Sequence, residues 1–156
     1  MLPNLRKRLG EDRGFTLIEL LVVILIIGIL AAIAIPAYLN HQKKGEDADA
    51  VSNARNLVSK VELCYATNED YTACDSLAAL GGAGEVGVPW GTNPGEVSVI
   101  ASNTTKTSYE VKAVSKAQSN GSNHTFSIVR ASNGVTTRTC TAGTSNNNGS
   151  CKNGTW

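Results

Sequence analysis

Glu19 is the residue whose chemistry most requires a partner. It is the only ionisable residue in the 21-residue run 15–35, which is otherwise almost wholly hydrophobic. A carboxylate near the centre of a membrane costs about 2.5–3.5 kcal/mol on insertion scales, and the run contains no base that could pair with it. Glu19 therefore requires a partner from outside its own segment.

The apolar run 15–35 has the length of a membrane span. As a helix rising about 1.5 Å per residue it covers about 30 Å, the thickness of a bilayer core. Three bases precede it (Arg6, Lys7 and Arg8), so the positive-inside rule places the N-terminus in the cytoplasm. A cleaved secretory signal is an alternative, because Ala32-Ile33-Ala34 matches its cleavage pattern, and an ordinary single-span anchor is another. The run is longer than a signal core of about 7–15 residues, and neither alternative explains Glu19.

The segment Gly14-Phe15-Thr16-Leu17-Ile18-Glu19 resembles the processing site of type IV prepilins and of their relatives in secretion systems, the pseudopilins. The shared features are a short basic leader, a glycine before the cut, a phenylalanine after it and a glutamate as the fifth mature residue. The resemblance implies that a membrane peptidase cleaves after Gly14 and that the new amino group of Phe15 is methylated. It divides the chain into a leader (1–14), a transmembrane and assembly helix (15–39) and a periplasmic or extracellular head (40–156).

The same resemblance assigns roles within the helix. Glu19 of one subunit is expected to pair with the Phe15 amine of a neighbour in a filament, which would penalise misplaced subunits because an unpaired buried charge is costly. Gly28 and Pro36 lie where these pilins carry helix-weakening residues. Pro36 lacks a backbone donor and clashes one turn back, so it predicts a kink or a local unwinding.

The four cysteines are Cys64, Cys74, Cys140 and Cys151, an even number that suggests two disulfides in an oxidising compartment. Three connectivities are possible. We favour Cys64–Cys74 and Cys140–Cys151, because each closes a short loop at the edge of a predicted element. A zinc site is disfavoured, since there is no Cys-x-x-Cys pair and the histidines are isolated.

The remaining ionisable residues predict no catalytic, metal or cofactor site, and we expect no enzyme. His41 and His124 have no obvious partner, which favours solvent-exposed or structural roles. Glu46, Asp47 and Asp49 could face bases of a neighbouring subunit, although a solvated face is favoured. From residue 40 onward ten bases balance ten acids, so there is no strong signal for nucleic-acid binding.

The head combines one helix with several strands. Residues 47–66 have helical periodicity, with an apolar stripe for packing on a sheet. That stripe consists of Val51, Ala54, Leu57, Val58, Val61, Cys64 and Tyr65. After an irregular, glycine-rich connection over 67–95, four strands are predicted at 96–102, 108–115, 125–131 and 135–141.

Two predicted turns connect the last three strands. Asn133-Gly134 predicts a tight hairpin, and residues 119–123 predict a looser turn. The polar C-terminal tail ends in Trp156, which is expected to pack at the sheet edge rather than bind a partner. The predicted fold class is α+β, with the architecture of type IV pilins. A long N-terminal helix, half transmembrane and half amphipathic, packs on a four-stranded antiparallel sheet with disulfide-tied loops.

The resemblance implies a structural subunit that polymerises through its N-terminal helix into a surface filament for adhesion, motility or DNA uptake. Its partners would be copies of itself, the prepilin peptidase, the inner-membrane assembly machinery and, through residues 15–39, the membrane. The precursor would lie in the bacterial inner membrane and the mature chain in an extracellular filament. One alternative is a pseudopilin of a type II secretion system, disfavoured because residues 141–156 contain no acid to bind calcium. Another is a minor tip pilin acting as a binding module.

Overall fold

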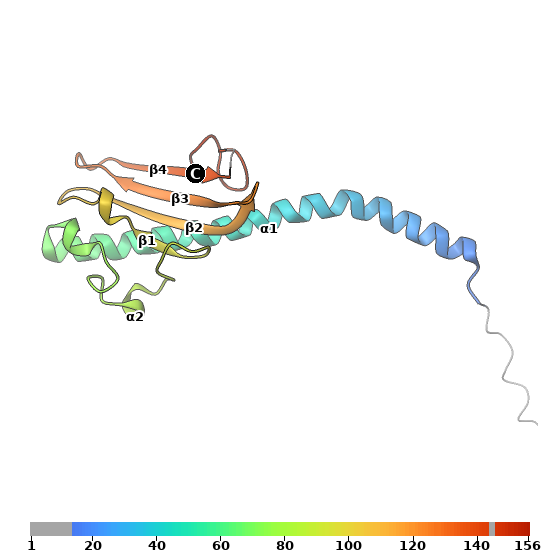
Figure 1. The fold of residues 1–156 in the computed structure, drawn as a ribbon, viewed down its shortest axis with the longest axis horizontal. Coiled ribbons are helices and arrows are strands. Elements are labelled where there is room, and N and C mark those ends of the chain that lie inside the picture. Colours follow the sequence, from blue (N-terminus) through green and yellow to red (C-terminus); the bar gives the residue numbers. More distant parts are fainter. Residues whose placement is uncertain (1–13, 144–145) are drawn as a thin grey trace, which may run out of the picture. The chain divides into compact units, whose positions relative to one another are not determined.

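The computed structural model describes residues 14–143 and 146–156, so the predicted leader, apart from Gly14, lies outside the described residues. The chain divides into two compact units, of which the first ends at Tyr38 and the second is Leu39–Trp156. Helix α1 (Leu17–Asn68) supplies residues to both units (Figure 1).

Helix α1 runs without interruption through Gly28 and Pro36, so this single chain shows none of the local unwinding predicted at Pro36. The helix ends at Asn68, where Glu69 takes a positive φ of 54° and its N–H donates to the Tyr65 carbonyl at 2.7 Å. A left-handed residue just past the last helical residue is a common helix stop, because it turns the chain out of the helix.

The predicted four-stranded antiparallel sheet is confirmed, with the strand order β1-β2-β3-β4. Its strands are β1 (Val97–Val99), β2 (Tyr109–Ser119), β3 (Ser122–Arg130) and β4 (Thr136–Ala142). Strand β1 is shorter than predicted, because a 3-10 turn, Ala101–Asn103, follows it. Strands β2 and β3 extend toward each other beyond their predicted ends, and Ser119 pairs directly with Ser122.

The structure reverses the predicted lengths of the two turns: the turn between β2 and β3 is the tight one, and the turn between β3 and β4 is longer. Asn120 and Gly121 form a two-residue turn between β2 and β3, with φ values of 52° and 76°. Between β3 and β4 only Gly134 has a positive φ, and the Ala131 N–H donates to the Val135 carbonyl across a three-residue loop. A two-residue hairpin of this kind requires positive φ at both central residues, whereas the three-residue loop needs it only at the last.

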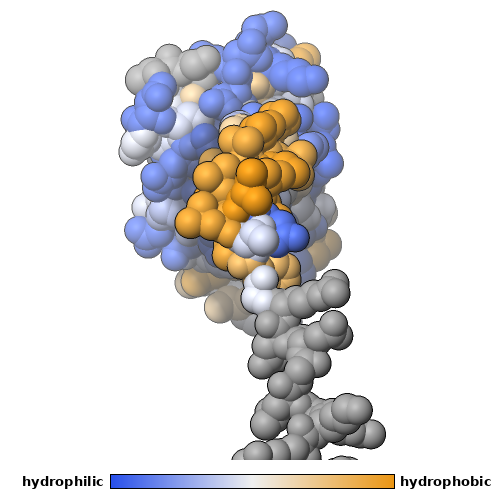
Figure 2. Space-filling view, turned by 90° about the vertical axis from the view of Figure 1, so that its right-hand side faces the viewer, coloured by the Kyte–Doolittle hydropathy of each residue, from blue (hydrophilic) through white to orange (hydrophobic). Residues whose placement is uncertain are grey.

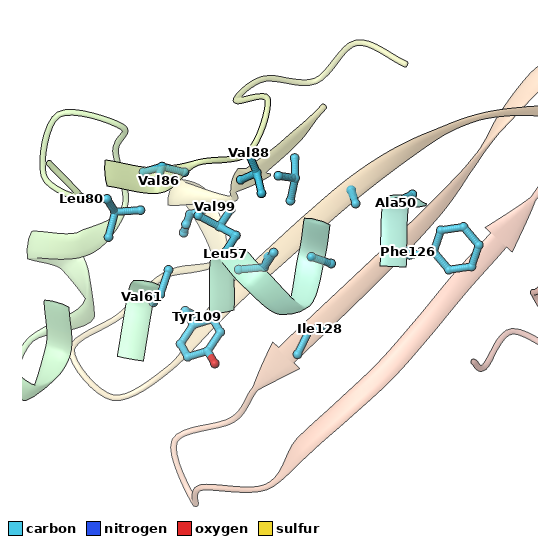
Figure 3. Close-up of a cluster of buried hydrophobic side chains, with 14 of the residues drawn as sticks. Ala50, Leu57, Val61, Leu80, Val86, Val88, Val99, Tyr109, Phe126 and Ile128 are labelled. Atoms are coloured by element: carbon cyan, nitrogen blue, oxygen red, sulfur yellow. The ribbon is translucent and has the colours of Figure 1, made fainter. Parts of the chain in front are cut away.

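The core of the second unit lies between the C-terminal half of α1 and one face of the sheet (Figure 1). Figure 3 shows Leu57 and Val61 of α1 facing Tyr109 and Ile128 of the sheet. The fully packed positions of the helix are Asp47, Ala50, Ala54, Leu57 and Val61. The predicted apolar stripe is thus rotated slightly, and Val51, Val58, Cys64 and Tyr65 lie at its margin, partly buried.

The connection between α1 and β1 is irregular, as predicted, with only short helical turns at Tyr71–Cys74 and Ala83–Val86 (α2). Both favoured disulfides are formed, Cys64–Cys74 with a sequence separation of 10 and Cys140–Cys151 with one of 11. The first ties the end of α1 to the connection, and the second ties β4 to the C-terminal loop.

Trp156 packs as predicted at the edge of the sheet. Its ring meets Phe126 edge to face at 5.9 Å, and its indole N–H donates to the Thr139 carbonyl at 3.0 Å. The guanidinium groups of Arg55 on α1 and Arg138 on β4 lie 5.3 and 5.5 Å from the ring centroid. The C-terminal residue thereby fills the space between helix and sheet beside β4.

Candidate functional site

The start of α1 is a capping box built by Thr16 and Glu19. The Glu19 N–H donates to Thr16 Oγ1 at 3.3 Å, and Glu19 Oε2 accepts from the Thr16 N–H and hydroxyl, both at 2.8 Å. The Ser/Thr-x-x-Glu spacing allows this reciprocal exchange, which satisfies donors that the first helical turn otherwise leaves free. Within one chain, Glu19 therefore defines where the helix begins.

The capping box leaves part of the Glu19 carboxylate available. Only Oε2 is engaged by Thr16, and within the described residues Oε1 accepts no hydrogen bond. Phe15 is 85% exposed and Gly14 is exposed beside it, so the predicted cleavage point is accessible. The site thus presents one free carboxylate oxygen next to the position where cleavage would create an amine.

The first unit exposes its hydrophobic side chains. Phe15, Tyr38 and nearly every large aliphatic residue between them are solvent-exposed, and Figure 2 shows hydrophobic side chains gathered in one continuous area. By length and composition, α1 is able to cross a membrane. A surface of this size requires lipid or other protein around it, because soluble monomers rarely expose apolar patches beyond a few hundred Å².

A second cluster, which we did not predict from the sequence, is buried inside the second unit. Asp47, expected on a solvated face, and His124, expected to have a solvent-exposed or structural role, are both 0% exposed. His124 Nδ1 lies 3.0 Å from both Asp47 carboxylate oxygens, and Nε2 lies 2.7 Å from Ser119 Oγ. The Ser150 N–H donates to Asp47 Oδ2 at 2.9 Å. We call these four residues the buried network.

The buried network joins α1, the β2–β3 hairpin and the C-terminal loop. At Gly149, with a φ of 61°, an added Cβ would collide with Asp47 Oδ2, so only glycine lets the loop approach the carboxylate. The order Ser119–His124–Asp47 is that of a hydrolytic triad, but a nucleophile must reach substrate. Since these side chains are buried, the arrangement serves structure: each buried polar group finds its partner inside the fold.

The sequence did carry a signal for this cluster. Asp47 continues the spacing of the buried helix positions by one turn, and His124 alternates in phase with Phe126 and Ile128 of β3. A polar residue in phase with a buried face indicates a buried polar contact. The periodicity identifies the face, although it does not identify the partner.

A third cluster centres on Glu62 of α1. Its carboxylate accepts from the Tyr71 hydroxyl at 2.9 Å and from the Tyr109 hydroxyl at 2.8 Å, and Arg130 lies 3.8 Å away. Burial, reinforced by the hydrogen bond to Glu62, raises the pKa of Tyr71 to about 12 and raises that of Tyr109 as well. The ring of Tyr65 stacks on that of Tyr71, with the ring centroids 4.0 Å apart. The cluster holds the end of the helix against the sheet.

The other predicted residues remain separate. His41 is exposed and makes no hydrogen bond or ion pair with the described residues, and Glu46 and Asp49 lie at the surface of α1. Gly28 and Pro36 are exposed within the apolar half of the helix. Among residues 14–143 and 146–156, no group of three or more His, Cys, Asp or Glu side chains could hold a metal ion.

Comparison with known proteins found one family model and several relatives that match part of the chain. Residues 11–35 match the family model described as the prokaryotic N-terminal methylation motif. The chain is 39% identical over 93 residues to the prepilin peptidase-dependent protein D of Escherichia coli, covering 60% of this chain and 59% of that protein. It is 38% identical over 78 residues to the type IV major fimbrial protein FimA of Dichelobacter nodosus, covering 46% of this chain and 50% of FimA.

A third relative is the type IV major pilin protein PilA of Myxococcus xanthus, 39% identical over 81 residues that cover 52% of this chain and 36% of PilA. The chain thus spans about half the length of the curated relatives it matches. No solved structure matches the chain. The relatives named as pilins or fimbrial proteins are structural proteins and not enzymes.

Proposed function

We propose that this chain, whose methylation motif, relatives and α+β fold support its identification as a type IV pilin, polymerises through its N-terminal helix into a surface filament. The observation that carries the proposal is the solitary Glu19 at the start of the exposed apolar half of α1. Filament packing would bury that helix. The filament would serve adhesion, motility or DNA uptake.

Assembly requires a mature N-terminus. Cleavage after Gly14 by a prepilin peptidase removes the basic leader and creates a cationic amine on Phe15, which is methylated in a separate step. Until then the precursor lies in the inner membrane through residues 15–39, with its N-terminus in the cytoplasm and the head, residues 40–156, outside. The assembly machinery of that membrane then transfers the mature subunit into the growing filament.

The Phe15 amine of one subunit pairs with Glu19 of its neighbour. The capping box supports this role, because it holds Glu19 through Oε2 and leaves Oε1 for the incoming amine. Inside an apolar bundle an unpaired carboxylate costs about 2.5–3.5 kcal/mol, so a misplaced subunit is rejected. Gly28 and Pro36 supply weak points at which the helix can extend when the filament is stretched.

Two substitutions, one at Glu19 and one at Thr16, separate the capping role of Glu19 from its charge. Glu19→Gln keeps an acceptor for the Thr16 N–H and removes the charge, and Thr16→Ala weakens the cap and keeps the charge. We expect Glu19→Gln to reduce sheared surface filaments strongly and Thr16→Ala to reduce them modestly. The assay is recovery of sheared filaments, with N-terminal sequencing and intact mass of the recovered subunit.

In the unaltered protein, a mature chain that begins with N-methylated Phe15 is the expected result. Glu19→Gln subunits that are processed correctly and enter filaments at the normal level would refute the charge pairing. Processed subunits that never appear in sheared material would instead favour a pseudopilin or a minor subunit.

A further inference from the structure

The rotation of α1 in the second unit is set by the buried network. Asp47 points into the fold and is bonded to His124 and Ser150, so the helix cannot turn about its axis without losing both contacts. The side chains on either side of Asp47 are therefore presented on defined flanks of the helix. Those flanks carry opposite charges.

The first flank is basic. A groove of about 240 Å³ lies between α1 and the C-terminal loop, and its charged lining residues are Lys44 and Lys152. Asn147 and Asn148 supply polar groups to the same groove. The C-terminal loop lies beyond the β4 edge of the sheet, where the Cys140 N–H donates to the Gly154 carbonyl at 2.9 Å. We call this surface the basic flank.

The second flank is acidic. A groove of about 320 Å³ is lined by Glu46 and Asp49 of α1 together with Pro89, Gly95 and Lys116. Because Trp90 pairs with Val97 of β1, this groove lies toward the β1 edge of the sheet. It holds two carboxylates and one ammonium group, so it carries a net negative charge. We call this surface the acidic flank.

The two flanks lie on opposite sides of α1. At 3.6 residues per turn, Asp49 is about 140° and Glu46 about 160° around the helix from Lys44. Among the described residues, Lys44, Asp49 and Lys152 form no ion pair, and Glu46 accepts only a 3.3 Å hydrogen bond from Gln42. These charges are therefore available to another molecule.

We propose that the basic flank of one subunit docks on the acidic flank of the next copy of this chain, with Lys44 meeting Asp49. Opposite charges on opposite sides of one helix favour a head-to-tail contact between two copies, since neither the basic flank nor the acidic flank attracts a second copy of itself. A head-to-tail contact that does not close into a ring generates an open helical filament. The contact rests on the proposed function and adds a second surface between subunits, outside the apolar half of α1.

Charge reversal tests the contact in a bacterium that assembles the unaltered chain. We expect Lys44→Glu and Asp49→Lys, each alone, to lower the yield of sheared filaments about fivefold or more, because attraction becomes repulsion in every contact. The double variant should return to within about twofold of the unaltered chain, because it restores the pair with its charges exchanged. Lys112→Glu, on the face of β2 that points away from α1, is the matched control and should assemble normally.

Cysteine cross-linking gives a second readout. Co-expressed full-length Lys44→Cys and Asp49→Cys chains should yield a disulfide-linked dimer in sheared filaments, which neither chain yields alone. Filaments of normal yield from both single-reversal variants, or a double variant that is not rescued, would overturn the contact and leave the proposed function intact. Failure of the unaltered chain to form filaments in its native host would overturn the proposed function itself.

Discussion

Removal of the Asp47 carboxylate should destabilise the second unit more than removal of any exposed acid on α1. Asp47→Ala deprives His124 Nδ1 and the Ser150 N–H of their common acceptor, 0% exposed in the native state. A buried donor left without its acceptor costs about 1–3 kcal/mol, so the loss of the acceptor for both donors costs about 2–6 kcal/mol. For a domain of this size we expect the melting temperature to fall by about 10–20 °C.

The assay is thermal and urea denaturation of the full-length chain in detergent micelles, each followed by tryptophan fluorescence. Trp156 reports on the packing between helix and sheet because its ring contacts Phe126. Asp49→Ala is the matched control: it removes an exposed acid from the same helix and should change the free energy of unfolding by less than about 0.5 kcal/mol.

A double-mutant cycle tests whether the effect belongs to the buried network. Asp47→Ala and His124→Ala should be coupled by about 0.5–3 kcal/mol, because the two side chains are in direct contact. If Asp47→Ala lowered the free energy of unfolding no more than Asp49→Ala does, the assignment of Asp47 to a buried structural pair would be refuted.

Three further predictions concern the head. The pKa of Tyr71 is raised from about 10 to about 12, so the folded state favours the neutral hydroxyl. Because the folded value exceeds the unfolded one, stability should decline from about pH 10 to about pH 12, and Tyr71→Phe should flatten that decline in urea titrations against pH. Replacing Cys140 and Cys151 by serine opens an 11-residue loop and should cost about 3 kcal/mol, measured by urea unfolding beside the reduced parent. Trp156→Ala should cost about 1–3 kcal/mol in thermal unfolding through lost contact with Phe126, and no loss would show that the tail does not stabilise the fold.

Much of the architecture is predictable from local patterns. The apolar run around Glu19 predicts the first half of α1, because a segment surrounded by lipid can satisfy its backbone hydrogen bonds internally only as a helix. The Thr16-x-x-Glu19 spacing is a recognisable capping box, although from the sequence we expected only an intermolecular role for Glu19. Alternation of apolar residues likewise predicts the strands, whereas the ends of the strands depend on the type of turn that forms at each glycine.

By itself, the sequence determined the long N-terminal helix, whose apolar run 15–35 holds a single carboxylate, and the four strands, and it favoured the short loops that the cysteine pairs close. Each of these depends on neighbours along the chain, so spacing and composition reveal it. The tertiary structure alone decided that Asp47 would meet His124, 77 residues away, and that Arg55 and Arg138 would enclose Trp156. Such contacts depend on strand register and on the rotation of α1 against the sheet. Periodicity identifies the buried face of each element but leaves open which residues of two faces touch.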